Sequence, residues 1–424
     1  PALHCRDLIP RFPAGPRRAS VGAVRAMILG LALSGVAAGN DGDWCWTIPK
    51  DVGQVVNDPE GTWVQSLKLG GYVHLHSAFV DGEAAGRDFW YGRGTDWRRA
   101  RVTLNAKLLD SVSVVVHTNV VEDEGRVGGG VEWDYNGLFL AWAELDLKKL
   151  APGAPLDTWA IGYGKRKLKE LNEEMDTSID AILTVERSSF AAQLVPFRAG
   201  TGTTGVWTTG SFGKNQFILG LYTTDASPEF GNWADGTLVV GGWKYDFSDC
   251  LGADEATLSI GGGFQDVDPG DEIYSAWEWV LTPWFRYRDG CWDFRLSAAY
   301  GDNEGPSTVT GGSFAGLTVM PGYWLVKDRL MAVLRYQFVK SEAPRGVQLT
   351  SRYAREAGRP ENEAIPSLFT GRGDELHSVY AGLLWNLCPG RWTMLAGAEW
   401  EQLESRDTEV YQGVTGWFAT RLIF

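Results

Sequence analysis

Cationic and apolar side chains alternate along WRRARVTLNAKLL, which begins at Trp97. One set of alternate residues includes Arg99, Arg101 and Lys107, and the residues between them are apolar from Ala100 onward. In a β-strand these two sets face opposite sides. A guanidinium presents a planar fork of N–H donors that matches the oxygens of phosphate or carboxylate. The chemistry expected of the polar face is therefore reversible anion binding, provided that this face meets water.

The composition limits the class of protein and of partner. The chain has 424 residues, including 53 Gly and 20 Trp, and 22% of its residues are charged. Both signs of charge and many aromatic residues argue against disorder. The formal net charge of −14 argues against nucleic acid as a partner, because nucleic acids bind basic surfaces. The mature chain contains no apolar run of about 18 residues, so no transmembrane helix is expected.

From about residue 64 onward, the sequence keeps one rhythm of alternating apolar and polar residues. The connections between the alternating segments are short and long in turn, and 81–94, 166–202 and 341–374 are long. This pattern predicts an all-β fold, a transmembrane antiparallel β-barrel of about 16 strands with short turns at one end. The predicted strands are 65–80, 96–108, 111–121, 137–148, 157–165, 203–212, 215–224, 236–247, 255–265, 273–288, 291–301, 313–326, 329–341, 375–387, 391–403 and 412–424.

The two faces of these strands differ in charge. In 329–341, Leu334 and Phe338 share a face opposite Arg335. A dry core cannot hold so many ions, because each unpaired buried ion costs several kcal/mol. The ionic face is therefore expected to line a wet lumen and the apolar face to meet lipid. Alternation assigns to the lumen the cations Lys68, Arg99, Arg101, Lys107, Lys244, Arg286, Arg288, Arg295, Arg335 and Arg421, and the acids Glu144, Asp146, Asp246, Glu278, Asp293, Glu399 and Glu401.

Both ends of the sequence predict export. A basic stretch precedes the apolar segment Ala26–Gly35 and the small residues Val36–Ala38, as in a secretory signal, with a buried helix as the alternative. The last predicted strand ends on Phe424, as do many bacterial outer-membrane barrels. The predicted organisation is a signal peptide at 1–38, a periplasmic N-terminal segment at 39–64 and an outer-membrane β-barrel at 65–424.

Side chains on the outer face are expected to follow the depth of the membrane. Phe139 and Ala141 are assigned to the lipid face of their strand. Tryptophans near strand ends suit the aromatic girdles at the membrane interfaces. The candidates for these girdles are Trp159, Trp292, Trp385 and Trp417.

Three segments, taken in order, resemble the phosphate-selective porin O and P family. They are LKLGGYVHLHSAF, WRRARVTLNAKL and AIGYGKRKLKELNEEMDTSIDAILTVERSS, and the similarity covers about 67–224. The resemblance implies a sixteen-stranded, homotrimeric, anion-selective porin whose arginines and lysines bind phosphate. The WRRAR match carries that role to Arg99 and Arg101, and the ERS match carries it to Arg187. The basic tract after the fifth predicted strand adds Lys165, Arg166, Lys167 and Lys169.

Alternation and resemblance together give one set of candidate residues. For each, the alternative is an ion pair with a lumenal carboxylate that only stabilises the wall. The candidate anion-binding and pore-lining residues are Arg99, Arg101, Lys107, Lys68, Arg166, Lys167, Arg187 and Arg335.

Two long connections bear on the lumen. The connection 166–202 is too long for an ordinary loop. We expect it to fold inward and to narrow the lumen, its acids between Glu170 and Asp180 pairing with lumenal cations; a surface lid is the alternative. The connection 341–374 carries several arginines and is expected to be a solvated loop, with a basic vestibule as the alternative.

Other reactive residue types give weaker expectations. His74, His76 and His117 point inward by alternation, and we expect them to be polar lumen residues without a bound metal. No catalytic constellation stands out and no cofactor is implied, so an enzyme is not expected. One disulfide is hypothesised between Cys250 and Cys291, while the pairing of the other cysteines stays open.

The sequence favours an outer-membrane porin for passive diffusion of small anions, and by resemblance of phosphate. Small inorganic anions, the lipid bilayer and two further copies of the chain are the expected partners. One alternative is a general or cation-preferring diffusion porin, since many loop residues are acidic. The other is a structural or adhesive barrel whose lumen is plugged by a long loop.

Overall fold

The computed structural model describes residues 52–121, 133–178, 181–193, 202–225, 227–266, 277–303, 311–357 and 371–424. The signal peptide predicted at 1–38 and the first part of the segment 39–64 lie outside these described residues, as do Cys5, Cys45 and Asp180.

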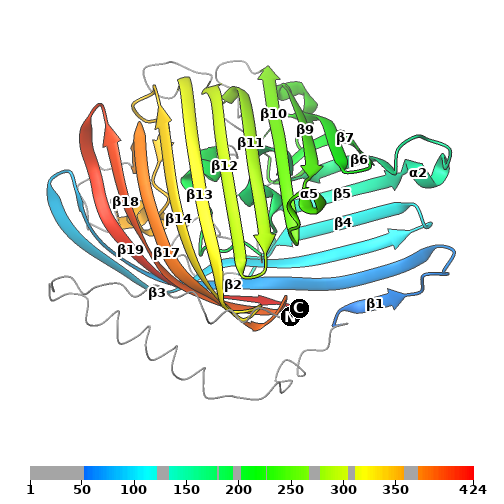
Figure 1. Cartoon of the computed structure of the whole chain (residues 1–424), viewed down its shortest axis with the longest axis horizontal. Helices are drawn as coiled ribbons and strands as arrows, with labels where there is room; N and C mark the ends of the chain where they lie inside the picture. The colour runs from blue at the N-terminus through cyan, green and yellow to red at the C-terminus, as the bar shows by residue number, and fades with distance from the viewer. Residues whose placement is uncertain are drawn as a thin grey trace.

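Sixteen antiparallel strands close into one barrel within the described part of the chain (Figure 1). The wall closes where β19 (Thr408–Ile423) pairs with β2 (Val64–Ala84), from Tyr411 opposite Ala84 to Ile423 opposite Tyr72. The predicted fold class and strand number are confirmed. The other wall strands are β3 (Arg87–Leu108), β4 (Val112–Asn119), β5 (Leu138–Asp146), β6 (Thr158–Arg166), β7 (Thr203–Phe212), β8 (Asn215–Thr223), β9 (Thr237–Asp246), β10 (Glu255–Asp266), β11 (Trp277–Asp289), β12 (Trp292–Asn303), β13 (Gly312–Val326), β14 (Leu330–Ser341), β17 (Glu375–Cys388) and β18 (Trp392–Ser405).

Shorter elements lie outside the wall strands. β1 (Gln54–Asn57) pairs with the beginning of β2. The remaining short strands, β15 (Val347–Gln348) and β16 (Arg372–Gly373), pair with each other. The helical elements are α2 (Leu147–Leu150), η2 (Lys169–Leu171), α3 (Glu173–Asp176), α4 (Ser189–Gln193), η3 (Trp233–Asp235), α5 (Ser248–Leu251) and α6 (Arg352–Ala357).

The connections alternate as the sequence predicts, with one clear exception. The predicted loop 81–94 is wrong, because β2 and β3 stay paired up to Ala84 and Arg87. A two-residue turn joins them, in which Ala85 and Gly86 both have positive φ values of 51° and 74°. Such a turn matches the right-handed twist of long paired strands. The hairpin therefore rises above the rim as continuous sheet.

Burial follows the predicted alternation along most strands. On β14, Leu334 is 55% exposed on the outside, whereas the neighbouring Arg335 is 1% exposed on the inside. Leu219, Leu281 and Val379 are other outward apolar residues that are more than one-third exposed. An outer wall of exposed aliphatic side chains around an ionic interior is stable only where lipid covers the outside.

Two assignments to the outer face are wrong. A register shift between His117 and Thr118 turns Phe139 inward, where it is 4% exposed. Trp417 stands opposite Ala78 on the lumenal face and packs against Tyr353 at 5.4 Å between ring centroids. By contrast, Trp292 is 53% exposed on the outer face near the short turns, as a girdle residue should be.

The hypothesised disulfide between Cys250 and Cys291 is also wrong. Cys250 is a free, exposed thiol in α5, whereas Cys291 and Cys388 are disulfide-bonded. In the described part of the chain, no helix is both long and apolar enough to cross a membrane.

We expect a charge on the outer face of β14 to destabilise the barrel in lipid. Leu334→Arg should lower the free energy of unfolding by about 2–4 kcal/mol, the cost of a cation near the bilayer midplane. Urea titration of the protein in lipid vesicles measures the change. Leu251→Arg is the matched control, because Leu251 is also 55% exposed but lies in the turn helix α5. Equal losses in the two variants would contradict the lipid-facing assignment.

Candidate functional site

The connection between β6 and β7 enters the lumen, which confirms the predicted inward fold. Its helical segments η2, α3 and α4 pack against the inner faces of β9 to β14. Glycines in the wall make room for it, because a Cβ on Gly261 would lie 2.2 Å from the carbonyl oxygen of Glu170. A Cβ on Gly316 would likewise lie 2.2 Å from the ring of Phe190. We call residues 167–193 the inner loop.

Acidic residues of the inner loop pair with arginines and lysines of the wall, as predicted. Glu173 is 1% exposed and accepts from Arg286 at 2.7 Å and from Arg295 at 3.1 Å. Asp176 pairs with Lys244 at 2.6 Å. These carboxylates point outward from the loop toward β9, β11 and β12. Burial would make each charge costly alone, so the pairs hold the loop in one position.

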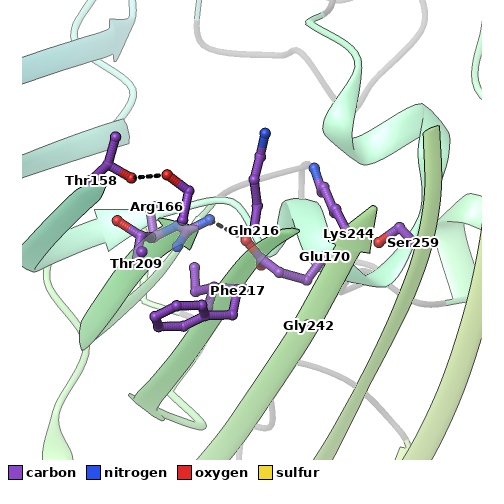
Figure 2. A pocket seen from close by; sticks show the side chains of 12 residues that line it. Thr158, Arg166, Glu170, Thr209, Gln216, Phe217, Gly242, Lys244 and Ser259 are labelled. Atoms are coloured by element: carbon purple, nitrogen blue, oxygen red, sulfur yellow. Dashed lines mark hydrogen bonds and ion pairs between the residues drawn. The ribbon is translucent and has the colours of Figure 1, made fainter. Parts of the chain in front are cut away.

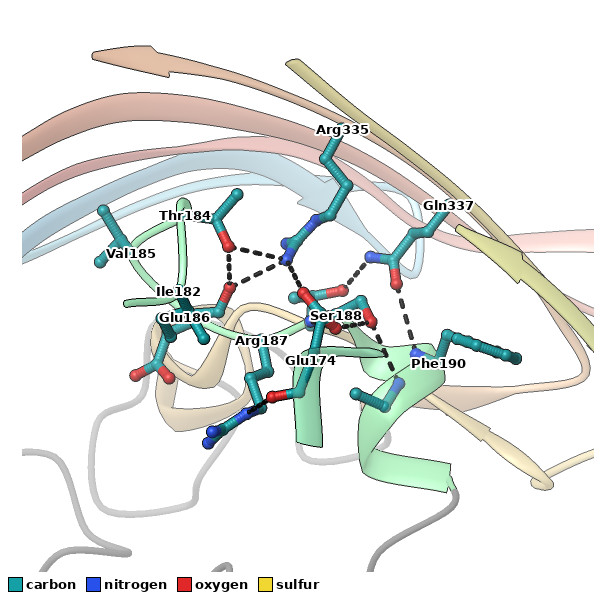
Figure 3. A network of polar contacts seen from close by, with 12 residues as sticks. Glu174, Ile182, Thr184, Val185, Glu186, Arg187, Ser188, Phe190, Arg335 and Gln337 are labelled. Atoms are coloured by element: carbon teal, nitrogen blue, oxygen red, sulfur yellow. Dashed lines mark hydrogen bonds and ion pairs between the residues drawn. The ribbon is translucent and has the colours of Figure 1, made fainter. Parts of the chain in front are cut away.

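Arg335 fixes the middle of the inner loop to β14, further along the wall (Figure 3). Its guanidinium lies 3.1 Å from a carboxylate oxygen of Glu174 and 2.9 Å from one of Glu399. It also donates to the carbonyl oxygen of Glu186 at 2.9 Å. The Arg335 side chain is 0% exposed. The expectation that Arg335 lines the open pore is therefore corrected, because protein groups enclose its charge.

Arg421 supports the same segment from β19. It donates to the carbonyl oxygens of Ile182 at 2.7 Å and Thr184 at 2.6 Å. These bonds occupy carbonyl groups that no secondary structure satisfies, which is a usual requirement for an irregular loop in a buried position.

Glu186 neutralises part of the positive charge of Arg98 and Arg99 on β3. It bonds to Arg98, and its other oxygen lies 3.4 Å from Arg99. Burial opposes ionisation of Glu186, but the charges of Arg98 and Arg99 outweigh burial and hold its pKa well below the usual value. The Arg99 side chain is only 8% exposed. The inner loop therefore covers Arg99. Arg99 acts on ions in the lumen through its electric field more than by direct contact.

A cluster of cations remains on the β2–β5 side of the lumen. The Arg101 guanidinium lies 3.4 Å from the ring centre of Phe139, and the Lys167 ammonium lies 5.0 Å from the same centre. Arg101 also donates to Asn119 at 2.5 Å and to Tyr72. The stacked ring and the acceptors on Asn119 and Tyr72 orient the guanidinium.

The charges of this cluster reinforce one another. Burial, Arg187 and Arg101 lower the pKa of Lys167 well below its usual value. Lys167 and Arg187 are half-buried, and Lys169 is exposed. Among the described residues, neither lysine has a carboxylate within ion-pair distance. We call Arg101, Lys167, Lys169 and Arg187 the cation cluster.

Arg187 projects from the inner loop on the side away from Arg335 (Figure 3). It donates to the carbonyl oxygens of Glu174 at 2.8 Å and Thr177 at 3.4 Å. Carbonyl acceptors hold the side chain in place while leaving a full positive charge. The loop therefore directs its acids to the wall and its cations to the water-filled space.

The other predicted site residues have partners outside the cation cluster. Arg166 adjoins Lys167 in the chain, but its charge pairs with Glu170 at 2.6 Å, and it lies 5.1 Å from the ring of Trp207. Lys68 and Lys107 are half-buried near the short turns, where Lys107 lies 3.4 Å from the hydroxyl of Ser113. The structure thus brings Arg99, Arg101, Lys167 and Arg187 together, and it separates Lys68, Lys107 and Arg335 from them.

A second segment, which we did not predict from the sequence, also lies inside the barrel. The described part of the connection after β14 is not solvated as expected, since five of the six residues of α6 are buried against the lumen. Its backbone N–H of Thr350 donates to Glu401 at 2.7 Å, and Tyr353 donates to Asp96 at 3.0 Å. Arg352 lies 3.6 Å from the same Asp96 carboxylate. In the sequence, only the isolated acids Asp96 on β3 and Glu401 on β18 indicated that a segment inside the barrel would bind to them.

The histidines form no metal site in the described residues. His74 and His76 point into the protein interior, as predicted, and are 0% and 1% exposed. Arginines surround them, Glu186 lies 3.6 Å from His76, and no group of three or more metal-binding side chains occurs within the part of the chain that the structure covers.

Comparison with solved structures finds porins. An anion-selective porin from Comamonas acidovorans matches with a TM-score of 0.52 and 14% identity, covering 85% of this chain and 99% of that chain. OprB from Pseudomonas putida matches with a TM-score of 0.53 and 8% identity, covering 84% and 94%. No protein-family model and no curated protein matches. This chain therefore has the fold of outer-membrane porins, and its resemblance to the phosphate-selective family stays a prediction.

Removing one loop acid should loosen the inner loop. Glu173→Gln leaves Arg286 and Arg295 without their shared carboxylate, and breaking a buried pair in this way costs about 3–5 kcal/mol. We expect faster proteolysis of the inner loop and noisier channel current. Glu229→Gln, at an exposed acid of another loop, is the control. Identical behaviour of the two variants would show that the pair does not hold the loop.

Proposed function

We propose that this protein is an outer-membrane porin that lets small anions diffuse in preference to cations. The observation that carries this proposal is the division of charge on the inner loop. Glu173 and Asp176 face the wall and are paired, whereas Lys167, Lys169 and Arg187 lie toward the lumen. Rings and clusters of Lys and Arg at a constriction favour anions.

The cation cluster would act by replacing part of the hydration of the ion. An anion near Lys167 and Arg187 meets two positive charges, neither of which has a carboxylate within ion-pair distance among the described residues. Arg99 and Arg101 add attraction from behind, since charges act more strongly across protein than across water. These cations do not enclose the ion on all sides. The ion can therefore leave as readily as it binds.

Phosphate is the finer form of the proposal. Arg187 is half-buried and offers a planar fork, which suits an oxyanion better than a spherical halide, whereas Arg101 is only 3% exposed. The sequence resemblance to the phosphate-selective family supports the same solute. The same resemblance also implies a homotrimer. The anion-selective porin from Comamonas acidovorans has a comparable barrel, and that likeness supports the general class of function.

A plugged barrel is the second candidate, and one observation favours it. Both the inner loop and α6 lie inside the barrel, so two segments fill part of the lumen. Conductance separates the candidates, because a structural or adhesive barrel would pass no current after correct folding. A cation-preferring porin is separated from an anion-preferring one by the sign of the reversal potential.

Reversing two loop charges should change ion selectivity. In planar bilayers across a salt gradient, we expect an anion-selective reversal potential for the wild-type chain. Lys167→Glu combined with Arg187→Glu should lower the anion-to-cation permeability ratio several-fold, or invert it, because the local field reverses sign. Lys327→Glu, in the exposed turn after β13, is the control. A wild-type potential that favours cations would refute the proposal.

Alkaline conditions should weaken anion preference through Lys167. Its pKa is lowered by burial and by neighbouring cations, so it loses its charge at a lower pH than ordinary lysines do. We expect the permeability ratio to fall as pH rises toward the usual lysine range. Lys167→Arg should keep the ratio constant, since Arg stays protonated. A parallel decline in both forms would assign the titration to another group.

A further inference from the structure

A cavity of about 410 Å³ lies on the lumenal face of β6 to β10, beside the beginning of the inner loop (Figure 2). It begins beside the cation cluster, since its lining residues Arg166 and Glu170 adjoin Lys167 and Lys169 in the chain, and its volume falls within the roughly 300–1,000 Å³ typical of small-molecule sites. The proposed anion path does not use it. Its lining includes Arg166, Glu170, Thr209, Gln216, Lys244 and Ser259.

Two buried polar atoms at this cavity have no hydrogen-bond partner among the described residues. Arg166 occupies one carboxylate oxygen of Glu170 at 2.6 Å, while the other oxygen, Oε2, is buried and accepts no hydrogen bond. The hydroxyl of Ser259, whose residue is 0% exposed, also has no partner. A buried polar atom without a partner costs about 1–3 kcal/mol, so such atoms mark places where a ligand or water completes the structure.

The charges at the cavity cancel in pairs. Arg166 pairs with Glu170, and Lys244 pairs with Asp176 at 2.6 Å. An anion is opposed by Glu170, and a cation is opposed by Arg166 and Lys244. A neutral ligand with hydroxyl groups meets neither penalty, and it can donate to the open Glu170 oxygen.

The rest of the lining suits a ligand with several hydroxyl groups. Thr209 and Gln216 offer both donors and acceptors, and the hydroxyls of Thr158 and Ser211 lie 2.7 Å apart as a bonded pair. Ile218 adds an apolar patch against which the C–H face of a ring can pack. This combination of neutral polar groups and an apolar patch is the chemistry that recognises a sugar or polyol.

We propose that this cavity is a binding subsite for an uncharged polyhydroxylated solute of monosaccharide size. The ligand donates one hydroxyl to Glu170 and exchanges a hydrogen bond with Ser259, and Gln216 bonds it at the lumenal side. The site rests on the proposed open lumen for access, and it differs from the adjoining cation cluster because its own charges are paired.

The test uses the full-length folded protein with glucose as the probe. Titration calorimetry in detergent should show saturable binding at millimolar concentration. In bilayers, glucose should reduce the single-channel current by a saturable fraction beyond its effect on bulk conductivity. Ser259→Ala should weaken binding about five- to tenfold, the effect of one lost hydrogen bond. Gln216→Ala is the second variant, at an exposed position that tolerates substitution.

Ser297→Ala, at a buried lumenal serine of β12, is the matched control and should leave the affinity unchanged. A conducting channel without saturable glucose binding would overturn the subsite while leaving the porin proposal intact. Equal affinity in wild type, Ser259→Ala and Gln216→Ala would also overturn it, by placing the sugar elsewhere. Calorimetric binding to a barrel without conductance would support the subsite and refute the porin proposal.

Discussion

A charge removed from water is stable only when another charge or a set of dipoles meets it, and the interior of this barrel follows that constraint throughout. Glu173 lies between Arg286 and Arg295, and Arg335 lies between Glu174 and Glu399. Each pair joins the inner loop to a different arc of the wall. Ion pairs of this kind contribute little net stability when compared with apolar packing. Their value here is positional, because a loop held at several points around the barrel cannot slide or rotate.

The same constraint explains how an acidic chain can present a positive surface to the lumen. The acids of the inner loop pair with cations of the wall. The electric field that reaches the water therefore comes from side chains on the other face of the loop, which do not take part in these pairs. Lys167 and Arg187 are such residues, and their acceptors are an aromatic ring and carbonyl groups. Net charge therefore says little about selectivity in a pore, since what matters is which charges remain exposed after pairing.

Strand positions could be predicted from the sequence because the period of two is local and repeats along each strand. The predicted 203–212 and 255–265 lie within one residue of β7 and β10. The failures have equally local causes. The residues at 81–94 are polar enough to resemble a loop, and only pairing with a long partner strand keeps them in β2 and β3. The shift that turns Phe139 inward depends on one bulge, and no residue type marks it. Inward folding of the inner loop followed from its length and acids. Which cations would stay exposed did not, because that depends on partners more than a hundred residues away, as for Glu174 and Arg335.

Anchoring the inner loop also divides the lumen into chemically different sides. Toward β2 to β5, Lys167 and Lys169 present positive charge, and neither has a carboxylate within ion-pair distance among the described residues. Toward β6 to β10, Arg166 and Lys244 each meet a carboxylate, so the local charge cancels and hydrogen bonding dominates. One segment of chain generates both sides, since Glu170 and Asp176 leave it in one direction and Arg187 in the other. On the two proposals above, anions would be drawn to the side of Lys167 and Lys169, and neutral hydroxylated molecules to the side where the charges are paired. Two kinds of selectivity can coexist in one pore in this way, because neither requires the other to be weakened.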